Sequence, residues 1–300
     1  MRTAAIVGAG PIGCSVGLAL RRHGVVTYLI DTDQEAARRA EVRGAGVAEA
    51  PPQPADIAVV AVPPGQVAQV LAQHQRRGTA RVYTEVSGVK VRLYQEARAQ
   101  GCDLTALVAG HPVVGAGGSG PLEAREDLFE GRPWALTPTD ATDTPALNCA
   151  LELVALCGAV SVLLDPEAHD RAVALVSHAP HVIASLAAAR LLDGHESAVR
   201  LAGQDLRDVT RTADGNLDLW TEILTANAGP VADQLDGWAL QAGLLAGELR
   251  EIAGAGDTVR PERLRETLRF GAAGRARIPE PWDAQRTGHA SVHPSERTPT

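Results

Sequence analysis

The apolar positions in the first half of the chain fall into short, nearly continuous runs separated by amphipathic segments. The runs predict five buried strands, at residues 4–7, 25–30, 57–62, 80–85 and 104–109. Helical spacing is found between them, near residues 11–23, 33–44, 65–76 and 89–100. This alternation predicts right-handed βαβ units around a parallel sheet. A strand at 133–138, a helix at 144–158 and a strand at 159–164 are expected to extend that sheet.

After Asp165 the pattern changes. As far as about Ala253 the apolar positions recur at helical spacing, and no run there indicates a strand. We therefore predict a Rossmann-type, doubly wound α/β domain at 1–164 and an all-helical substrate and dimerisation domain at 165–275. The helices are too apolar to cover only one another, which favours a homodimer. Residues 276–300 lack periodicity and are rich in Pro, Ser, Thr and charge, so we expect a disordered tail there.

Composition narrows the possible partners. The formal net charge of -8 argues against nucleic acid or an anionic membrane as the main partner. We expect no membrane span, because no uninterrupted apolar stretch of about 18 residues is seen, and no targeting segment precedes the first strand. The four cysteines (Cys14, Cys102, Cys149 and Cys157) lack CxxC or Cys/His spacing, which favours reduced thiols in a cytoplasmic protein without a metal site.

A glycine-rich motif follows the first predicted strand and opens the first helix. Gly8, Gly10 and Gly13 have the G-x-G-x-x-G spacing that allows a tight turn, close approach of a pyrophosphate, and close packing of helix on strand. About 20 residues further on, Asp31 ends the second strand, where a carboxylate accepts hydrogen bonds from an adenosine ribose. That charge would repel a 2′-phosphate, so we predict NAD rather than NADP. A glycine-rich turn without nucleotide is the alternative. The remaining predicted cofactor contacts are Pro11, Ile12 and Val62.

Two histidines interrupt an apolar helical segment, in "SHAPH" at residues 177–181. Buried imidazoles need partners for their ring nitrogens, so three interpretations compete: satisfied core histidines, part of a metal site, or polar groups that face a ligand. A metal needs three facing ligands, and only His169 with Asp170 offers a nearby supplement to His178 and His181. The pattern leaves these alternatives open.

Two polar residues are expected beyond the carboxyl ends of strands, where doubly wound sheets bind ligands. Ser87 follows the fourth predicted strand and His111 follows the fifth. Both are therefore candidates for proton handling near a nicotinamide ring.

Several of these stretches together resemble one family. "GHPVVG", "SGPLEAREDLFEGRPWALTP", "AHDRAVALVSHAPH" and "LRDVTRTADGNLDLWTEILTAN" are similar to the prephenate dehydrogenases, whose members oxidise prephenate or arogenate on the route to tyrosine. The similarity runs from about residue 3 to about residue 250, with the motifs in the family's order. It implies NAD-dependent oxidative decarboxylation of a small molecule by a homodimer with a helical C-terminal domain.

The resemblance also implies roles for individual residues. His111 matches the histidine that accepts the proton of the substrate's ring hydroxyl, and His181 matches a histidine of the substrate pocket. Arg211 matches an arginine that holds a substrate carboxylate, and Trp220 a residue near the substrate's side chain. A solvated helix charge and an ordinary core residue are the alternatives for these last two.

Two departures from the family pattern bear on the substrate. Family members usually have Asp-Val-Gly/Ala-Ser-Val-Lys where this chain has residues 85–90, Glu-Val-Ser-Gly-Val-Lys, so the hydroxyl of Ser87 is displaced by one position. The loop after His111 has Ala116, Gly117 and Gly118 in place of polar residues. Arogenate or an amino-substituted analogue is therefore an alternative substrate.

Two other functions compete with this one. A β-hydroxy or imine oxidoreductase usually carries a catalytic Lys in its C-terminal helices, but the only Lys here is Lys90. The alternative from another class is a regulator that binds NAD(H) without catalysis.

Overall fold

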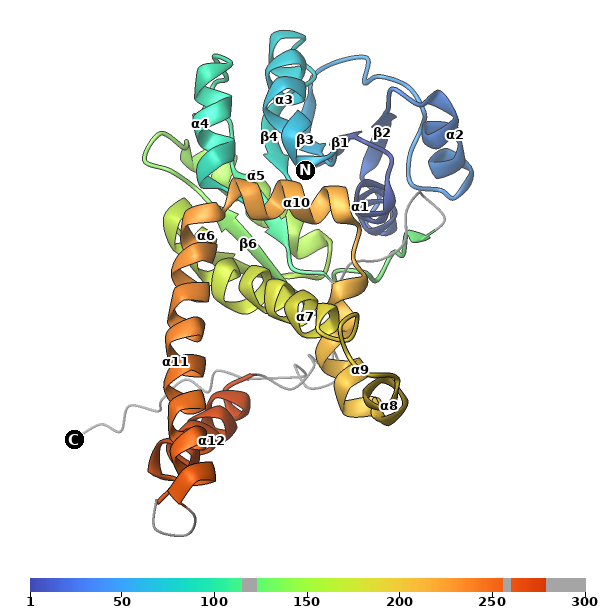
Figure 1. Cartoon of the computed structure of the whole chain (residues 1–300). Coiled ribbons are helices and arrows are strands. Elements are labelled where there is room, and N and C mark those ends of the chain that lie inside the picture. Colours follow the sequence, from blue (N-terminus) through green and yellow to red (C-terminus); the bar gives the residue numbers. More distant parts are fainter. Residues whose placement is uncertain (115–122, 256–259, 279–300) are drawn as a thin grey trace, which may run out of the picture. The chain divides into compact units, whose positions relative to one another are not determined.

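Four parallel strands form the centre of the first half of the chain (Figure 1). They are β1 (Thr3–Val7), β2 (Val26–Ile30), β3 (Ala55–Val60) and β4 (Ala80–Glu85), in the order β2-β1-β3-β4. The connecting helices are α1 (Pro11–Arg22), α2 (Gln34–Val42) and α3 (Val67–Arg76), and α4 (Val91–Ala99) follows β4. Successive residues of β1 enter two different apolar clusters, because strand side chains alternate between the faces of a sheet. Helices α1 and α2 cover one face, and α3 and α4 cover the other.

Three more strands form a second, mixed group. They are β5 (Ala109–Pro112), β6 (Pro133–Thr137) and β7 (Val160–Leu163), with α5 (Thr144–Leu156) between the last two. Strand β5 is antiparallel to β6, whereas β6 and β7 are parallel. A parallel bridge between Tyr83 and Leu107 lies beside β4.

The predicted fifth strand at 104–109 is wrong in its limits, although Leu107 does pair in parallel with β4. The Asp103 carboxylate accepts hydrogen bonds from both the amide and the hydroxyl of Thr105, and this contact holds a turn at the start of the segment. Regular pairing begins only at Ala109 and is antiparallel. His111 consequently lies inside β5 instead of following it.

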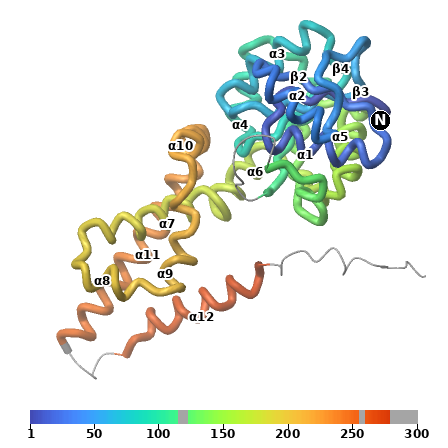
Figure 2. The backbone as a smooth tube through the Cα atoms, turned by 90° about the vertical axis from the view of Figure 1, so that its right-hand side faces the viewer, coloured from blue at the N-terminus to red at the C-terminus, as the bar shows by residue number. Residues whose placement is uncertain are grey.

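Helices make up the rest of the chain that the structure describes. They are α6 (Pro166–Val173), a π turn (Ala174–His178), α7 (Ala179–Ala189), α8 (Glu196–Leu201), α9 (Gln204–Thr210), a 3-10 turn (Arg211–Asp214), α10 (Leu217–Ala226), α11 (Ala228–Ala255) and α12 (Glu262–Ala276). Figure 2 follows the backbone from α6 into α7. This arrangement confirms the predicted fold class, a Rossmann-type sheet domain followed by helices.

The computed structural model describes residues 1–114, 123–255 and 260–278. By its internal contacts the chain divides into two compact units, residues 1–243 and 244–300. In the second unit, the Glu248 carboxylate accepts the amide hydrogens of Arg263 and Leu264 at the start of α12. The predicted domain limits stay a prediction, and most of the predicted tail lies outside the described residues. The four cysteines carry free thiols.

One helix is long and apolar enough to cross a membrane by length and composition alone. It comprises Pro166–Ala189, 24 residues that include α6, the π turn and α7. Polar residues interrupt this helix, so it is not an uninterrupted apolar stretch, and the expected absence of a membrane span stays a prediction. Those polar residues include His169 and Asp170, which are buried and hydrogen-bonded inside the protein.

Candidate active site

The glycine motif forms the turn between β1 and α1. Gly8 has a φ of +101°, and a Cβ atom there would lie 2.3 Å from the carbonyl oxygen of Ala61. A Cβ atom on Gly13 would lie 2.0 Å from the carbonyl oxygen of Gly8. At Gly10, by contrast, no heavy atom lies within 4 Å of the equivalent point. The turn therefore requires glycine at two positions and leaves open space at the third, over the N-terminus of α1, where a pyrophosphate would approach.

Asp31 lies directly after β2 and is fixed to this turn. Its Oδ2 accepts the amide hydrogen of Ala9 at 2.7 Å, and its Oδ1 accepts that of Asp33 at 2.8 Å. Each oxygen keeps a second lone pair for a ribose hydroxyl. A surface hollow beside it is lined by Leu29, Ile30, Asp31, Gln34, Ala37, Arg38, Ala48, Glu49 and Ala50. The open turn and the fixed carboxylate fit a dinucleotide.

The other predicted cofactor residues lie around the same turn. Pro11 is the first residue of α1, followed by the partly buried Ile12. Val62 follows β3, and its Cγ1 atom is 3.2 Å from the point where a Cβ of Gly8 would lie. All seven predicted cofactor residues thus gather at the carboxyl ends of β1, β2 and β3.

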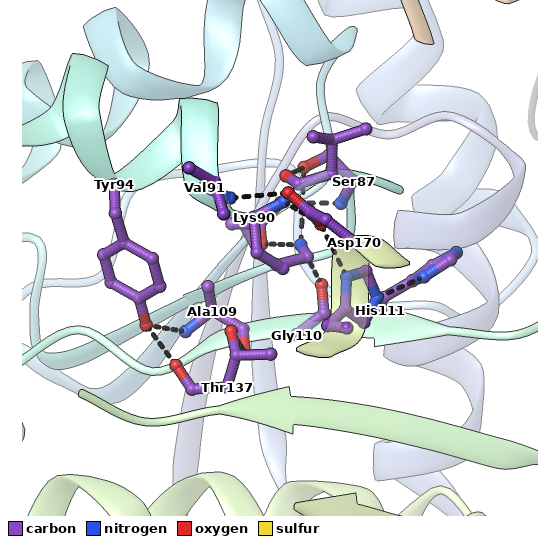
Figure 3. A network of polar contacts seen from close by, with 12 residues as sticks. Ser87, Lys90, Val91, Tyr94, Ala109, Gly110, His111, Thr137 and Asp170 are labelled. Carbon is purple, nitrogen blue, oxygen red and sulfur yellow. Dashed lines mark hydrogen bonds and ion pairs between the residues drawn. The ribbon is translucent and has the colours of Figure 1, made fainter. Parts of the chain in front are cut away.

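His111 lies on β5 and is part of a hydrogen-bonded chain of side chains (Figure 3). Its Nδ1 is 3.0 Å from Nε2 of His169, and Nδ1 of His169 is 2.8 Å from Oδ1 of Asp170. Burial holds the pKa of His111 well below its ordinary value, and the nearby Lys90, His169 and His178 lower it further. The imidazole is therefore neutral near pH 7 and able to accept a proton.

Asp170 joins this chain to two other segments. Its carboxylate oxygens accept the amide hydrogens of Lys90 and Val91, both at 2.9 Å, at the start of α4 (Figure 3). Its carbonyl oxygen accepts a hydrogen bond from Nδ2 of Asn227 at 2.8 Å. That amide nitrogen also lies 3.1 Å from Nδ1 of His178. Asn227 follows α10, so three distant segments hold α6 in place beside β5.

A buried ion pair lies next to His111. The side chains of Lys90 and Glu85 are fully buried and paired with each other, and Nζ of Lys90 also donates to the carbonyl oxygen of Gly110 at 2.6 Å. Burial lowers the pKa of Lys90, and the charge of Glu85 opposes that effect. The hydroxyl of Ser87 lies 3.4 Å from Nζ of Lys90 and makes no hydrogen bond to His111. Ser87 therefore does not hold the imidazole directly, because its hydroxyl is turned toward the ion pair.

His181 and Trp220 are in direct contact. Their rings stack with centroids 3.7 Å apart and planes inclined by 10°, while His178 approaches Trp220 edge-on at 6.2 Å. Nδ1 of His181 is buried and has no hydrogen-bond partner among the described residues. A side chain on Gly215 would collide with Trp220, its Cβ lying 2.5 Å from Nε1. His178 is thus a satisfied buried histidine, whereas His181 keeps a buried ring nitrogen without a hydrogen-bond partner among the described residues.

Arg211 lies apart from this contact. It begins the 3-10 turn that packs against α7, the helix of His181, and its side chain is exposed. Within the described ranges it makes no hydrogen bond or ion pair, so its charge is available to a ligand. The structure brings Arg211 to the neighbourhood of His181 but not into contact with His111.

Sequence reasoning missed the residues that surround His111. The sequence indicates His169 and Asp170 only as possible metal ligands, but in the structure His169 bonds to both Asp170 and His111. In the part of the chain that the structure describes, no three His, Cys, Asp or Glu side chains are grouped to hold a metal ion. The signal in the sequence was the presence of His169 and His178 within one apolar helical segment. A buried imidazole needs a hydrogen-bond partner, so two of them in such a segment indicate a buried polar cluster.

Comparisons with known proteins agree with this geometry. The profile of the prephenate dehydrogenase nucleotide-binding domain matches residues 16–163, and that of the prephenate dehydrogenase dimerization domain matches residues 165–270. The chain is 51% identical over 282 residues to the probable prephenate dehydrogenase NovF of Streptomyces niveus, covering 93% of this chain and 78% of that protein.

Two solved structures share the fold. The crystal structure of Synechocystis arogenate dehydrogenase matches with a TM-score of 0.77 and 26% identity, covering 92% of this chain and 100% of that one. The prephenate dehydrogenase of A. aeolicus in complex with hydroxyphenyl propionate and NAD+ matches with a TM-score of 0.81 and 24% identity, covering 93% and 99%. At 24% identity, the similarity to the A. aeolicus structure is evidence for the fold alone.

Proposed function

Because the chain belongs to the prephenate dehydrogenase family, we propose that it catalyses the NAD-dependent oxidative decarboxylation of prephenate to 4-hydroxyphenylpyruvate, a step of tyrosine biosynthesis. The observation that carries this proposal is the neutral, partly buried imidazole of His111, held by a hydrogen-bonded chain. Such a group suits the removal of a proton from a hydroxyl.

The substrate supplies most of the driving force. Prephenate carries a carboxylate and a 4-hydroxyl on a cyclohexadiene ring, so loss of hydride from C4 allows carbon dioxide to leave and the ring to become aromatic. Bound NAD supplies the hydride acceptor. The protein's own contribution is to position the ring and to take the hydroxyl proton at Nε2 of His111.

The helical part supplies the substrate contacts in this proposal. Arg211 has an exposed guanidinium that makes no ion pair with any described residue, which suits bidentate binding of a carboxylate. His181 has a buried nitrogen without a hydrogen-bond partner in the part of the chain that the structure describes, and the stacked ring of Trp220 holds that imidazole in place. Ser87 has an indirect role, through the Lys90 ion pair.

A second candidate substrate is arogenate or an amino-substituted analogue. A Cβ atom at Gly88 would lie 3.8 Å from Nε2 of His111, and glycine leaves that space free for a substrate group. The other difference from the family, at Ala116, Gly117 and Gly118, lies outside the described residues.

We also propose a cytoplasmic homodimer that uses neither nucleic acid nor membrane as a partner. A dimerization-domain profile covers the helical part, and Val176 and Leu186 on the α6–α7 helix expose apolar side chains that suit a subunit contact. A monomer by light scattering at micromolar concentration would contradict the dimer.

The decisive experiment is turnover. Purified protein is given prephenate, arogenate or an amino-substituted analogue with NAD or NADP, and the absorbance of the reduced cofactor is followed. We expect NAD-dependent turnover with at least one substrate and a lower kcat/KM with NADP, because the Asp31 carboxylate occupies the place of a 2′-phosphate. No turnover with any pair, together with measurable NAD binding, would instead indicate a nucleotide-binding regulator.

A further inference from the structure

His169 is a buried histidine that the proposed chemistry does not use. Its side chain is 1% exposed, yet both ring nitrogens have partners: Nδ1 contacts Asp170 and Nε2 contacts His111. The rings of His169 and His111 meet edge to face, with centroids 5.2 Å apart and planes inclined by 71°. This geometry orients the plane of the His111 ring as well as one of its nitrogens.

The hydrogen positions along this chain follow from the acceptors. The Asp170 carboxylate already accepts two backbone amide hydrogens, and a carboxylate only accepts, so Nδ1 of His169 donates to it. In a neutral His169 ring the other nitrogen, Nε2, then has no hydrogen and accepts one from Nδ1 of His111. His111 is left with its hydrogen on Nδ1 and a free lone pair on Nε2.

That free nitrogen lies on the open side of the ring. Nε2 of His111 has no hydrogen-bond partner within the described part of the chain, and Gly88, whose Cβ would lie 3.8 Å from it, has no side chain to cover it. The opposite tautomer would direct a hydrogen, not a lone pair, at a substrate hydroxyl. A base with that tautomer could not accept the proton.

We propose that His169, anchored by Asp170, is a positioning residue that holds His111 in the Nδ1–H tautomer, with Nε2 free to accept the proton of the substrate. The inference rests on the proposed role of His111 as the base. No other described side chain does this for Nδ1: the hydroxyl of Ser87 faces Lys90, and Lys90 donates to Glu85 and Gly110. His169 lies on α6, and within the described residues no hydrogen bond or ring contact joins it to His181, Arg211 or Trp220.

The tautomer is measured directly, without substrate. Protein labelled with ¹⁵N on the imidazole nitrogens gives long-range proton–nitrogen spectra that identify which nitrogen of each of the nine histidines carries hydrogen. Loss of one signal set in His111→Asn assigns the ring. We expect His111 as the Nδ1–H tautomer at pH 7 and His169 likewise. An Nε2–H tautomer of His111 in the unmutated protein would overturn the proposal.

Kinetics separate positioning from packing. His169→Leu removes the acceptor and should lower kcat about ten- to a hundredfold while KM changes less than about twofold. His169→Gln keeps an acceptor oxygen near the former Nε2, and should restore kcat to within about fivefold of the unmutated enzyme. Equal kcat values for Leu and Gln, or no loss in either, would overturn the proposal.

The matched control is His74→Gln. His74 is a buried histidine on α3 whose Nδ1 lies 2.9 Å from the hydroxyl of Thr79, far along the chain from the site. We expect its kcat to be unchanged, and a loss equal to that of His169→Leu would assign both effects to general destabilisation. If the unmutated protein oxidises no substrate, the proposed function fails, while the tautomer measurement still tests the role of His169.

Discussion

The glycine turn between β1 and α1 and the polar cluster around His111 place their functional groups by different means. In the turn, six consecutive residues, Gly8 to Gly13, shape the backbone, and at two of the glycines an added Cβ atom would lie closer than 3 Å to a backbone atom. In the cluster, side chains from separate segments meet: His111 and His169 are 58 residues apart in sequence, and Lys90 and Asp170 are 80 apart.

The difference has a consequence for substitutions. In the turn, a substitution at Gly13 disturbs the local backbone, whereas a substitution at Gly10 affects the bound cofactor. A change in the cluster leaves a buried polar group without its partner, so chemistry and stability change together. The following variants test whether the two regions respond in these different ways.

The largest effect is expected for His111→Asn. Asparagine keeps hydrogen-bonding capacity but cannot take the proton, so kcat should fall by about a hundred- to ten-thousandfold with little change in KM. Steady-state rates with the best substrate measure it. A near-normal kcat in this variant would show that another residue is the general base, with His181 the next candidate.

The pH profile of the unmutated enzyme sharpens this test. The neutral imidazole is the active form, so activity is lost as pH falls through the pKa of His111. Because burial and Lys90 lower that pKa well below its ordinary 6.5, the acid limb should lie below the usual histidine range. The limb should be absent from the residual activity of His111→Asn.

Lys90→Met should cause the next largest effect, this time on folding. It leaves the fully buried Glu85 carboxylate without its partner, which costs about 3 to 5 kcal/mol of unfolding free energy. Urea unfolding monitored by circular dichroism measures the loss. The double variant Glu85→Leu/Lys90→Met removes both charges and should recover much of it.

The control for that prediction is the exposed pair of Arg39 with Glu35 on α2. Arg39→Met should cost less than about 1 kcal/mol, because water screens the pair. Similar losses for Lys90→Met and Arg39→Met would show that the buried pair is no more important than a surface one.

The sequence allowed prediction of the turn but not of the cluster, for a physical reason. The G-x-G-x-x-G spacing encodes a backbone shape within a few residues, and Asp31 follows from the length of one βα unit. The contacts of His169 depend instead on how α6 packs beside β5, which no local spacing records. The helical pattern predicted α6 and α7 but not the π turn at Ala174–His178 between them.

The strand at 104–109 shows the same limit within the fold. Its apolar run predicted a strand, but the Asp103 turn and antiparallel pairing with β6 decided where β5 begins. Both depend on residues outside the run. His111 was nevertheless identified as a candidate site residue, first from its expected place at the carboxyl end of a strand and then from the family resemblance.

The dependence of the free energy of unfolding on pH tests the contribution of His178 to the polar cluster. Burial lowers its pKa to about 4, whereas the unfolded chain titrates near 6.5. Between these values the unfolded state binds more protons, so stability should fall as pH is lowered from 6.5 to 4, by up to about 3 kcal/mol in all. His178→Gln, which still offers an acceptor to Asn227, should lose this part of the slope.

Urea unfolding at several pH values between 7 and 4 gives the free energy of unfolding of the unmutated protein and of His178→Gln. His74, His111 and His181 also have lowered pKa values and contribute an acid slope of their own. They are present in both proteins, so only the difference between the two curves belongs to His178. Parallel curves would contradict the prediction.

The smallest effects are expected in the glycine turn, where two alanine substitutions should separate folding from cofactor binding. In Gly13→Ala the new Cβ meets the carbonyl oxygen of Gly8, so α1 must move away from β1, at a cost of about 1 to 3 kcal/mol.

In Gly10→Ala the Cβ meets no protein atom, and the residue has an ordinary φ of -71°, so stability should change by less than about 0.5 kcal/mol. The methyl group does, however, enter the space over the N-terminus of α1, and the Kd for NAD should rise about tenfold. Thermal unfolding with and without NAD measures both quantities, and a Gly10→Ala protein with unchanged NAD affinity would mean that the cofactor does not occupy the space beside Gly10.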